Sequence, residues 1–258
     1  MTTEPALDEP VRVDAAADPR RAVRRLSIAG LVGIAISCAL EIVMHITPGG
    51  RRLDPLRTTI SEYALVPGAW MFAAGVLVLA AASVLIGAAL HHSGTIRFRG
   101  GWAVWYSLWC VGLVGLTVIT KTMIGPDPTV QGRIHWSFTL LAFVSLPIAL
   151  LLVVRRHVRR QLDFGNAPRD GALPEPPAPH RAVRIIAMLT WISFGWFAVL
   201  AAQTVLSLLG KDGLLPWVGI IERGVATTEI VAVGVLAWWV LDRTAEGRPA
   251  GQPDTVLS

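Results

Sequence analysis

The sequence predicts an all-α fold, a polytopic membrane bundle of six transmembrane helices with both termini in the cytoplasm. The first observation is composition: hydrophobic residues make up 53% of the 258 residues and charged residues 16%, whereas a soluble domain has about 25% charged residues. The second is that long stretches contain almost no charge. The third is that the basic residues are sorted between alternate connecting segments. Together these observations predict an integral membrane protein.

Six predominantly apolar runs follow one another along the chain, each close to the roughly 20 residues that a spanning helix needs. They are Leu26–Thr47, Ala69–Leu90, Trp102–Ile124, Trp136–Val154, Ile185–Leu209 and Leu215–Leu241. The first run is long and follows a polar segment, so it is not interpreted as a cleaved signal peptide. Cys38 and Cys110 both lie within runs, and we interpret them as packing residues and not as a disulfide.

Polar segments divide the chain around a membrane domain at residues 25–241. Residues 1–24 are acidic and alanine-rich without periodicity, which predicts a disordered cytoplasmic N-terminus. Residues 163–183 form a proline-rich linker between the fourth and fifth runs, predicted to be cytoplasmic. Residues 242–258 are predicted to be a second disordered cytoplasmic tail.

The sequence pI of about 10.0 would suit a nucleic-acid-binding protein, but the arrangement of the charges excludes this interpretation. With the N-terminus inside, sixteen of the 23 Lys and Arg residues fall in inner segments and two within apolar runs. The five in outer segments are Arg51, Arg52, Arg57, Arg133 and Lys211. This asymmetry follows the positive-inside rule. We therefore expect a plasma-membrane protein whose partners are membrane lipids and not nucleic acid.

Five charged residues lie within the apolar runs, where charge is costly and often functional. They are Glu41, Lys121, Glu222, Arg223 and Glu229. With His45 and His135, most of them fall in the predicted outer half of the bundle. Three glutamates face two cations, so either a carboxyl is protonated or His45 is charged. The alternative interpretation is that these residues form purely structural ion pairs.

Helical periodicity predicts where these side chains point. In the first run, a stripe with a spacing of four residues carries small side chains and then polar ones: Ala29, Gly33, Ser37, Glu41 and His45. We expect this stripe to pack inward and Glu41 to face Lys121 or Arg223. In the last run, Glu222 and Glu229 share one face, whereas Arg223 is turned about 100° away and needs a different partner.

The segment RTTISEYAL, residues 57–65, is unusually polar for a connection between two apolar runs. Thr59 followed by Glu62 predicts a capping box and a short helix over Ile60–Leu65. That interpretation leaves Arg57, Ser61 and Tyr63 without a role. We expect the segment to cover the outer ends of the helices, as a lid or as one side of a ligand site.

A second polar segment, residues 125–136, contains GPDP and then a histidine. Its prolines and glycines are sufficient to explain turns. In the functional interpretation, Asp127 and His135 are candidate catalytic residues that would act as a general base. No metal or other cofactor is predicted, because the sequence has no closely spaced set of ligands.

The blocks SEYAL and GPDP, the latter with His135 eight residues after Asp127, resemble a bacterial membrane family. It is the domain of unknown function numbered nine hundred and ninety-eight, and the resemblance covers roughly residues 25–241. The matching positions are Ser61, Glu62, Tyr63, Asp127 and His135. The resemblance implies a six-helix protein of a kind common in actinobacteria, and it implies no particular reaction.

Three function classes fit these residues, and no catalytic motif selects among them. The first is an outward-facing site that binds or modifies a lipid head group or small polar molecule. Its ligand-binding candidates are Glu41, His45, Arg57, Ser61, Glu62, Tyr63, Lys121, Glu222 and Arg223. The second is a proton-coupled small-solute transporter, with Glu41, Glu222 and Glu229 as a relay. The third is a structural or partner-binding membrane protein without catalysis.

Overall fold

Six long helices make up almost all of the computed structural model, which describes residues 19–125, 129–165, 181–209 and 217–245. They are α1 (Pro19–Ile46), α2 (Ala69–His92), α3 (Gly101–Val118), α4 (Val130–Gly165), α5 (Arg181–Leu208) and α6 (Val218–Ala245). Within these described ranges there is no strand. All six helices are long and apolar enough to cross a membrane, which confirms the predicted fold class.

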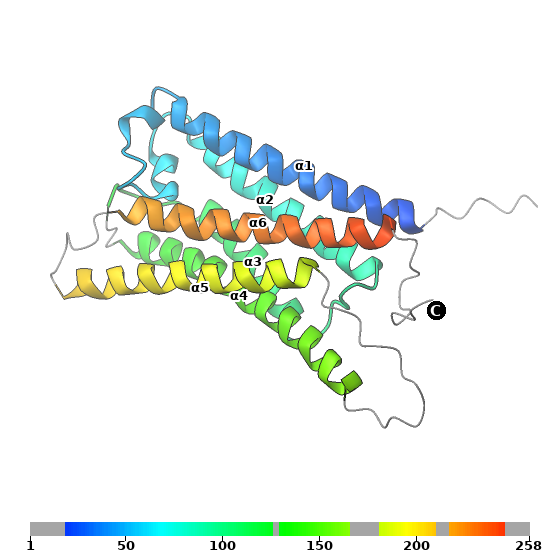
Figure 1. Cartoon of the computed structure of the whole chain (residues 1–258). Coiled ribbons are helices and arrows are strands. Elements are labelled where there is room, and N and C mark those ends of the chain that lie inside the picture. The colour runs from blue at the N-terminus through cyan, green and yellow to red at the C-terminus, as the bar shows by residue number, and fades with distance from the viewer. Residues whose placement is uncertain (1–18, 126–128, 166–180, 210–216, 246–258) are drawn as a thin grey trace, which may run out of the picture.

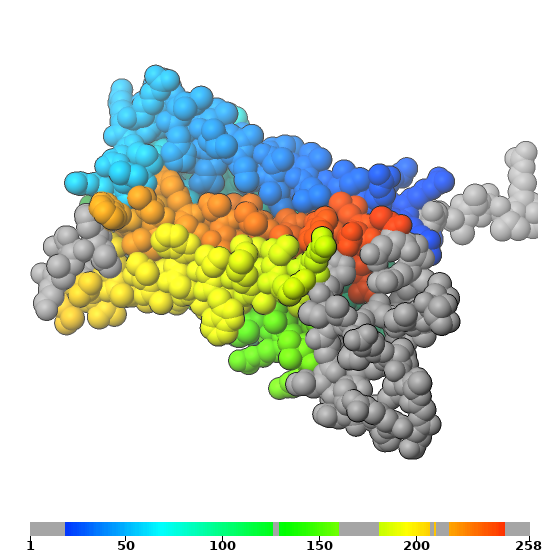
Figure 2. All heavy atoms as spheres, viewed as in Figure 1, coloured from blue at the N-terminus to red at the C-terminus, as the bar shows by residue number. Residues whose placement is uncertain are grey.

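The helices form one bundle in which α6 lies between α1 and α5 on the face shown (Figure 1). The pairs α1–α2, α3–α4 and α5–α6 pack most extensively, and α6 also contacts α1, α2 and α4. In the space-filling view, α1, α6 and α5 cover this face side by side (Figure 2). The start of α1 and the end of α6 lie at the same end of the bundle (Figure 1).

Two short 3-10 helices lie at the opposite end, in the connection between α1 and α2. They are η1 (Gly50–Arg52) and η2 (Ile60–Leu65). We call this the η2 end: α1, α3 and α5 finish here, and α2, α4 and α6 begin here. The bounds of η2 confirm the short helix predicted over Ile60–Leu65.

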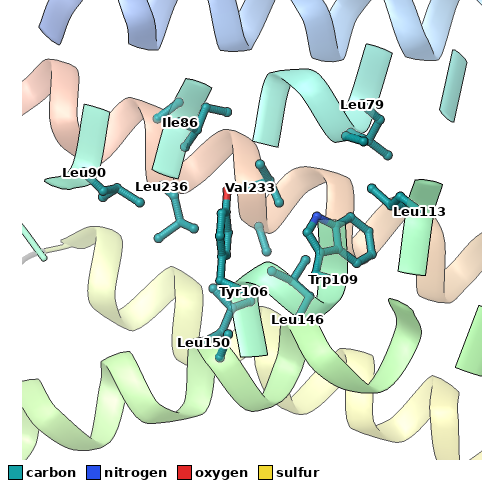
Figure 3. Packing of buried hydrophobic residues seen from close by; sticks show 14 of the residues in the cluster. Leu79, Ile86, Leu90, Tyr106, Trp109, Leu113, Leu146, Leu150, Val233 and Leu236 are labelled. Carbon is teal, nitrogen blue, oxygen red and sulfur yellow. The ribbon is translucent and has the colours of Figure 1, made fainter. Parts of the chain in front are cut away.

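Buried apolar side chains from α2, α3, α4 and α6 pack together at the centre of the bundle (Figure 3). Hydrogen bonds between helices add to this packing. Tyr106 and Trp109 of α3 are buried and both contact Ser83 of α2. The Tyr106 hydroxyl donates to the Ser83 carbonyl over 2.8 Å, and Trp109 Nε1 donates to Ser83 Oγ over 3.1 Å. Such bonds and close packing hold helices together in lipid, where the hydrophobic effect between helices is weak.

Small residues let α1 approach α2 closely, although not along the whole predicted stripe. A Cβ at Gly30 would collide with the side chain of Ile86. Ser37 is buried, whereas Ala29 is exposed, so the prediction fails at Ala29. The physical reason is that a spacing of four residues turns a side chain about 40° further at each step. Over two turns this moves Ala29 off the buried face.

Several helix boundaries differ from those expected. Helix α1 begins at Pro19, so residues 19–24 are helical, and α4 and α6 continue to Gly165 and Ala245. Helix α5 begins at Arg181, so residues 181–183 of the predicted linker are helical too. The rest of the predicted N-terminal segment, linker and tail lies outside the described residues. Helix α3 ends at Val118 and not near Ile124. Residues 117–120 are all β-branched, and β-branching slightly lowers helix propensity.

Candidate functional site

The η2 segment is inserted into its end of the bundle, because four of its six residues are buried: Ile60, Ser61, Glu62 and Tyr63. Glu62 Oε2 accepts a hydrogen bond from the Thr59 backbone N–H over 3.1 Å, and the predicted capping box is present. The segment packs against α2 and α6. A local sequence motif thus fixes a turn whose side chains face the helices.

Glu62 also anchors the connection between α3 and α4. Its Oε1 accepts from Lys121 Nζ over 2.9 Å and from the Gly125 backbone N–H over 2.8 Å. The two charged side chains are 4% and 10% exposed, so this is a buried ion pair. Lys121 therefore pairs with Glu62 and not with Glu41, because α3 ends before Lys121 and the loop carries its side chain to η2.

Glu222 ties α6 to the same segment. Its Oε2 accepts a hydrogen bond from the Ile60 backbone N–H over 2.6 Å, and the residue is 6% exposed. This N–H belongs to the first residue of η2, where helical backbone donors have no partner within the helix. A carboxylate at this position satisfies that donor and holds η2 against the start of α6.

Arg223 fastens the preceding loop to α6. Its Nη1 donates to the carbonyl oxygens of Pro55 and Thr58, both over 2.8 Å, and to Gly219 O over 3.0 Å. A Cβ at Gly219 would lie 2.5 Å from the Pro55 and Thr58 carbonyl oxygens, so only glycine lets the loop approach this closely. Arg223 and Glu222 have separate partners, which confirms the angular prediction for this pair.

His45 connects α1 to Arg223 and has a defined tautomer. Its Nε2 lies 3.0 Å from Arg223 Nη2, and its Nδ1 lies 2.6 Å from the Glu41 carbonyl oxygen. A guanidinium has only donors and a carbonyl only acceptors. Nε2 must therefore accept from Arg223 while Nδ1–H donates to Glu41 O. This arrangement defines His45 as a neutral imidazole.

Tyr63 lies beneath this contact and is fully buried. Its ring centroid is 4.6 Å from that of His45, and Arg223 Cζ lies 5.6 Å from the same ring centroid. Burial raises the pKa of the Tyr63 hydroxyl above its ordinary value, and the nearby Arg223 charge opposes that rise. The hydroxyl makes no hydrogen bond of ordinary geometry among the described residues.

Glu41 completes a group that we call the α1–α6 cluster: Glu41, His45, Tyr63 and Arg223. Its side chain is half-buried and lies within electrostatic range of His45 and Arg223. Among the residues that the structure describes, no cation lies within ion-pair distance of its carboxylate. Glu41 therefore differs from the other members of the cluster. Its side chain is partly exposed, and it has no ion-pair partner among the described residues.

The remaining predicted site residues do not join this cluster. Arg57 is exposed, and its Nε lies 3.7 Å from Oδ2 of Asp54, an exposed residue three positions earlier. Ser61 Oγ lies 3.3 Å from Thr59 Oγ1. His135 is buried near the start of α4, with Nδ1 2.6 Å from the Ile119 carbonyl oxygen just after α3. Asp127 lies outside the described residues.

Several groups that hold the site together are backbone atoms, which the sequence analysis did not identify. They are the Ile60 and Gly125 N–H groups and the Pro55, Thr58 and Gly219 carbonyls. Side-chain patterns do not reveal such groups. Across the four described ranges, no three His, Cys, Asp or Glu side chains are grouped closely enough to hold a metal ion.

Six apolar spans with a polar cluster closed by a buried turn define a multi-pass membrane protein. The chain belongs to the family described as "Protein of unknown function (DUF998)", which matches residues 28–239. The family assignment confirms the expected resemblance. Comparison with curated proteins gives no match, and comparison with solved structures gives none.

Proposed function

We propose that the α1–α6 cluster binds a lipid head group or small polar molecule that carries an amine. The observation behind this proposal is the half-buried Glu41 carboxylate, which has no ion-pair partner among the described residues. An ammonium group would supply the missing charge and donate hydrogen bonds to Glu41. His45 and Arg223 would keep the side chains of the cluster in position, and the Tyr63 ring would lie beneath them.

The basic side chains of the η2 end give less support to an anionic ligand. Lys121 is paired with Glu62, Arg223 is bonded to three carbonyl oxygens and His45, and Arg57 lies beside Asp54. Each of these three cations already has protein acceptors. Glu62, Lys121 and Glu222 accordingly position η2 in this proposal and do not contact the ligand.

The surroundings of Glu41 favour a ligand that arrives from the bilayer. Only 17% of the most apolar window of α1 is buried, against 50% for α2 and α6, so α1 has a wide apolar surface that lipid would contact in a membrane. Ile42 and Ile46 beside the cluster are 66% and 59% exposed. Glu41 lies about 8 Å from the end of α1, a depth at which head groups meet acyl chains.

The Glu41→Gln variant tests the proposal directly. The full chain in nanodiscs is titrated with phosphatidylethanolamine, and with phosphatidylglycerol as the anionic comparison. A charge-assisted hydrogen bond contributes about 1.5–3 kcal/mol, so we expect Glu41→Gln to weaken phosphatidylethanolamine binding about tenfold. Binding of phosphatidylglycerol should not weaken.

Asp54→Asn is the matched control, because it removes one negative charge at the same end while an amide oxygen still accepts the Leu56 N–H. It should leave the binding of both lipids unchanged. Equal affinity of wild type and Glu41→Gln for phosphatidylethanolamine would contradict the proposal. Free ethanolamine that competes with the lipid would identify the amine, and not the acyl chains, as the recognised group.

The proposed orientation places the η2 end outside the cell and both termini in the cytoplasm. It is supported by the basic residues near the other end, among them Arg24, Arg25, Arg97, Arg155 and Arg156, since positive charge stays inside. In a background with Cys38 and Cys110 replaced by Ala, Arg51→Cys and Arg133→Cys should react with an impermeant thiol reagent on intact cells. Arg97→Cys should react only after the cells are opened, and the reverse pattern would overturn the orientation.

A further inference from the structure

A second polar site lies deeper in the bundle, between α5 and α6, and it centres on Glu229. The residue is 1% exposed and Ser193 of α5 is equally buried. Ser193 Oγ donates to Glu229 Oε1 over 3.1 Å, whereas Glu229 Oε2 is buried without a hydrogen-bond partner. Glu229 lies about 17 Å along α6 from its first residue, near the middle of the span.

The groups around Glu229 cannot compensate an anion. Among the described residues, Ser193 is the one side chain hydrogen-bonded to this carboxyl, and the described parts of α1, α2, α4, α5 and η2 bring no cation within ion-pair distance of it. The nearest acidic residue on its own face, Glu222, is bonded to Ile60 N–H. An isolated carboxylate in such surroundings is so costly that a proton is taken up instead.

The charges of the η2 end strengthen this conclusion. Two cations, Lys121 and Arg223, compare with four carboxyl groups, those of Glu41, Glu62, Glu222 and Glu229. Lys121 is already paired with Glu62. His45 adds no charge, because its hydrogen bonds define the neutral tautomer. These carboxyls outnumber the two cations, and we assign a proton to Glu229, whose carboxyl receives one side-chain hydrogen bond, from Ser193, among the described residues.

We propose that Glu229 and Ser193 form a proton-binding site in the middle of the membrane, occupied by a proton at neutral pH. The ligand is a proton and not a metal cation, because hard cations such as Ca²⁺ need several oxygen ligands, whereas one carboxyl and one hydroxyl meet here among the described residues. When the proton leaves, an unpaired charge remains between α5 and α6. Release is therefore coupled to entry of water or separation of these two helices.

Infrared spectroscopy of the full chain in lipid tests this proposal. Wild type at neutral pH should show the carbonyl stretch of a protonated carboxylic acid, and Glu229→Gln should lose that band. Ser193→Ala removes the hydrogen bond to Oε1, so it should shift the band to higher frequency without abolishing it. Glu222→Gln is the matched control on the same helix face and should leave the Glu229 band in place.

Carbodiimide labelling gives an independent measurement on wild type. Dicyclohexylcarbodiimide adds to protonated carboxyls in apolar surroundings, and the acid proton passes to the carbodiimide nitrogen. Mass spectrometry should find the adduct on the peptide that contains Glu229, with the label lost as pH rises. Loss of the label on addition of Na⁺ at constant pH would overturn the assignment of the ligand. Absence of both the label and the infrared band would overturn the site, even if Glu229→Gln fails to fold.

Discussion

Lys121→Met is expected to destabilise the protein by about 3–5 kcal/mol, the usual cost of removing one member of a buried ion pair. The change strands the Glu62 carboxylate, which is 4% exposed on its side chain and lies 2.9 Å from Lys121 Nζ. Glu62 keeps its bonds to the Thr59 and Gly125 N–H groups, but these carry only partial charge. Equilibrium unfolding in mixed micelles measures the loss.

A double-mutant cycle that adds Glu62→Gln separates the energy of the ion pair from the other effects of the two substitutions. Lys121→Met and Glu62→Gln should be coupled by about 1–3 kcal/mol in the double variant, because the double change strands no buried charge. Lys121→Met combined with Glu41→Gln should be additive, since Lys121 does not pair with Glu41. Additive losses for Lys121 and Glu62 would mean that their contact contributes nothing to stability.

Local sequence signals predicted the parts of the structure that depend on neighbouring residues. Six apolar runs correspond to six helices, and Thr59 with Glu62 predicted the start of η2. The position of Arg223 one residue after Glu222 was enough to predict separate partners. In each case the relevant geometry is set within one or two helical turns, where spacing alone fixes direction.

The sequence could not predict contacts that depend on where a loop goes. An apolar run shows which residues a membrane can accommodate, but it does not show where the helix ends. The sequence therefore predicted that α3 continues beyond Val118. Lys121 was therefore predicted to lie on a helix and was offered as a partner for Glu41. It lies in a loop and pairs with Glu62. The carbonyls of Pro55 and Thr58 likewise became part of the site through a loop path that side-chain patterns do not encode.

Replacing Arg223 with Met should allow the loop before η2 to detach from α6. Nη1 of Arg223 joins α6 to the Pro55 and Thr58 carbonyls, and Nη2 bonds to His45. Hydrogen bonds to a charged group contribute about 1.5–3 kcal/mol each. Because Arg223 is only partly buried and water can replace some of these bonds, we expect a total loss of about 2–4 kcal/mol.

Trypsin provides a local measurement of this change, because Arg51, Arg52 and Arg57 lie exposed in the same loop. In wild type the loop is fixed at both Pro55 and Thr58, and cleavage after Arg57 requires it to leave α6. Arg223→Met should accelerate that cleavage by more than tenfold, since each 1.4 kcal/mol of local stability changes the open fraction tenfold. Arg133→Met, which removes an exposed arginine at the same end, should not change the rate. Equal cleavage rates in wild type and Arg223→Met would show that the Gly219 contact and the Glu222–Ile60 bond hold the loop without the guanidinium.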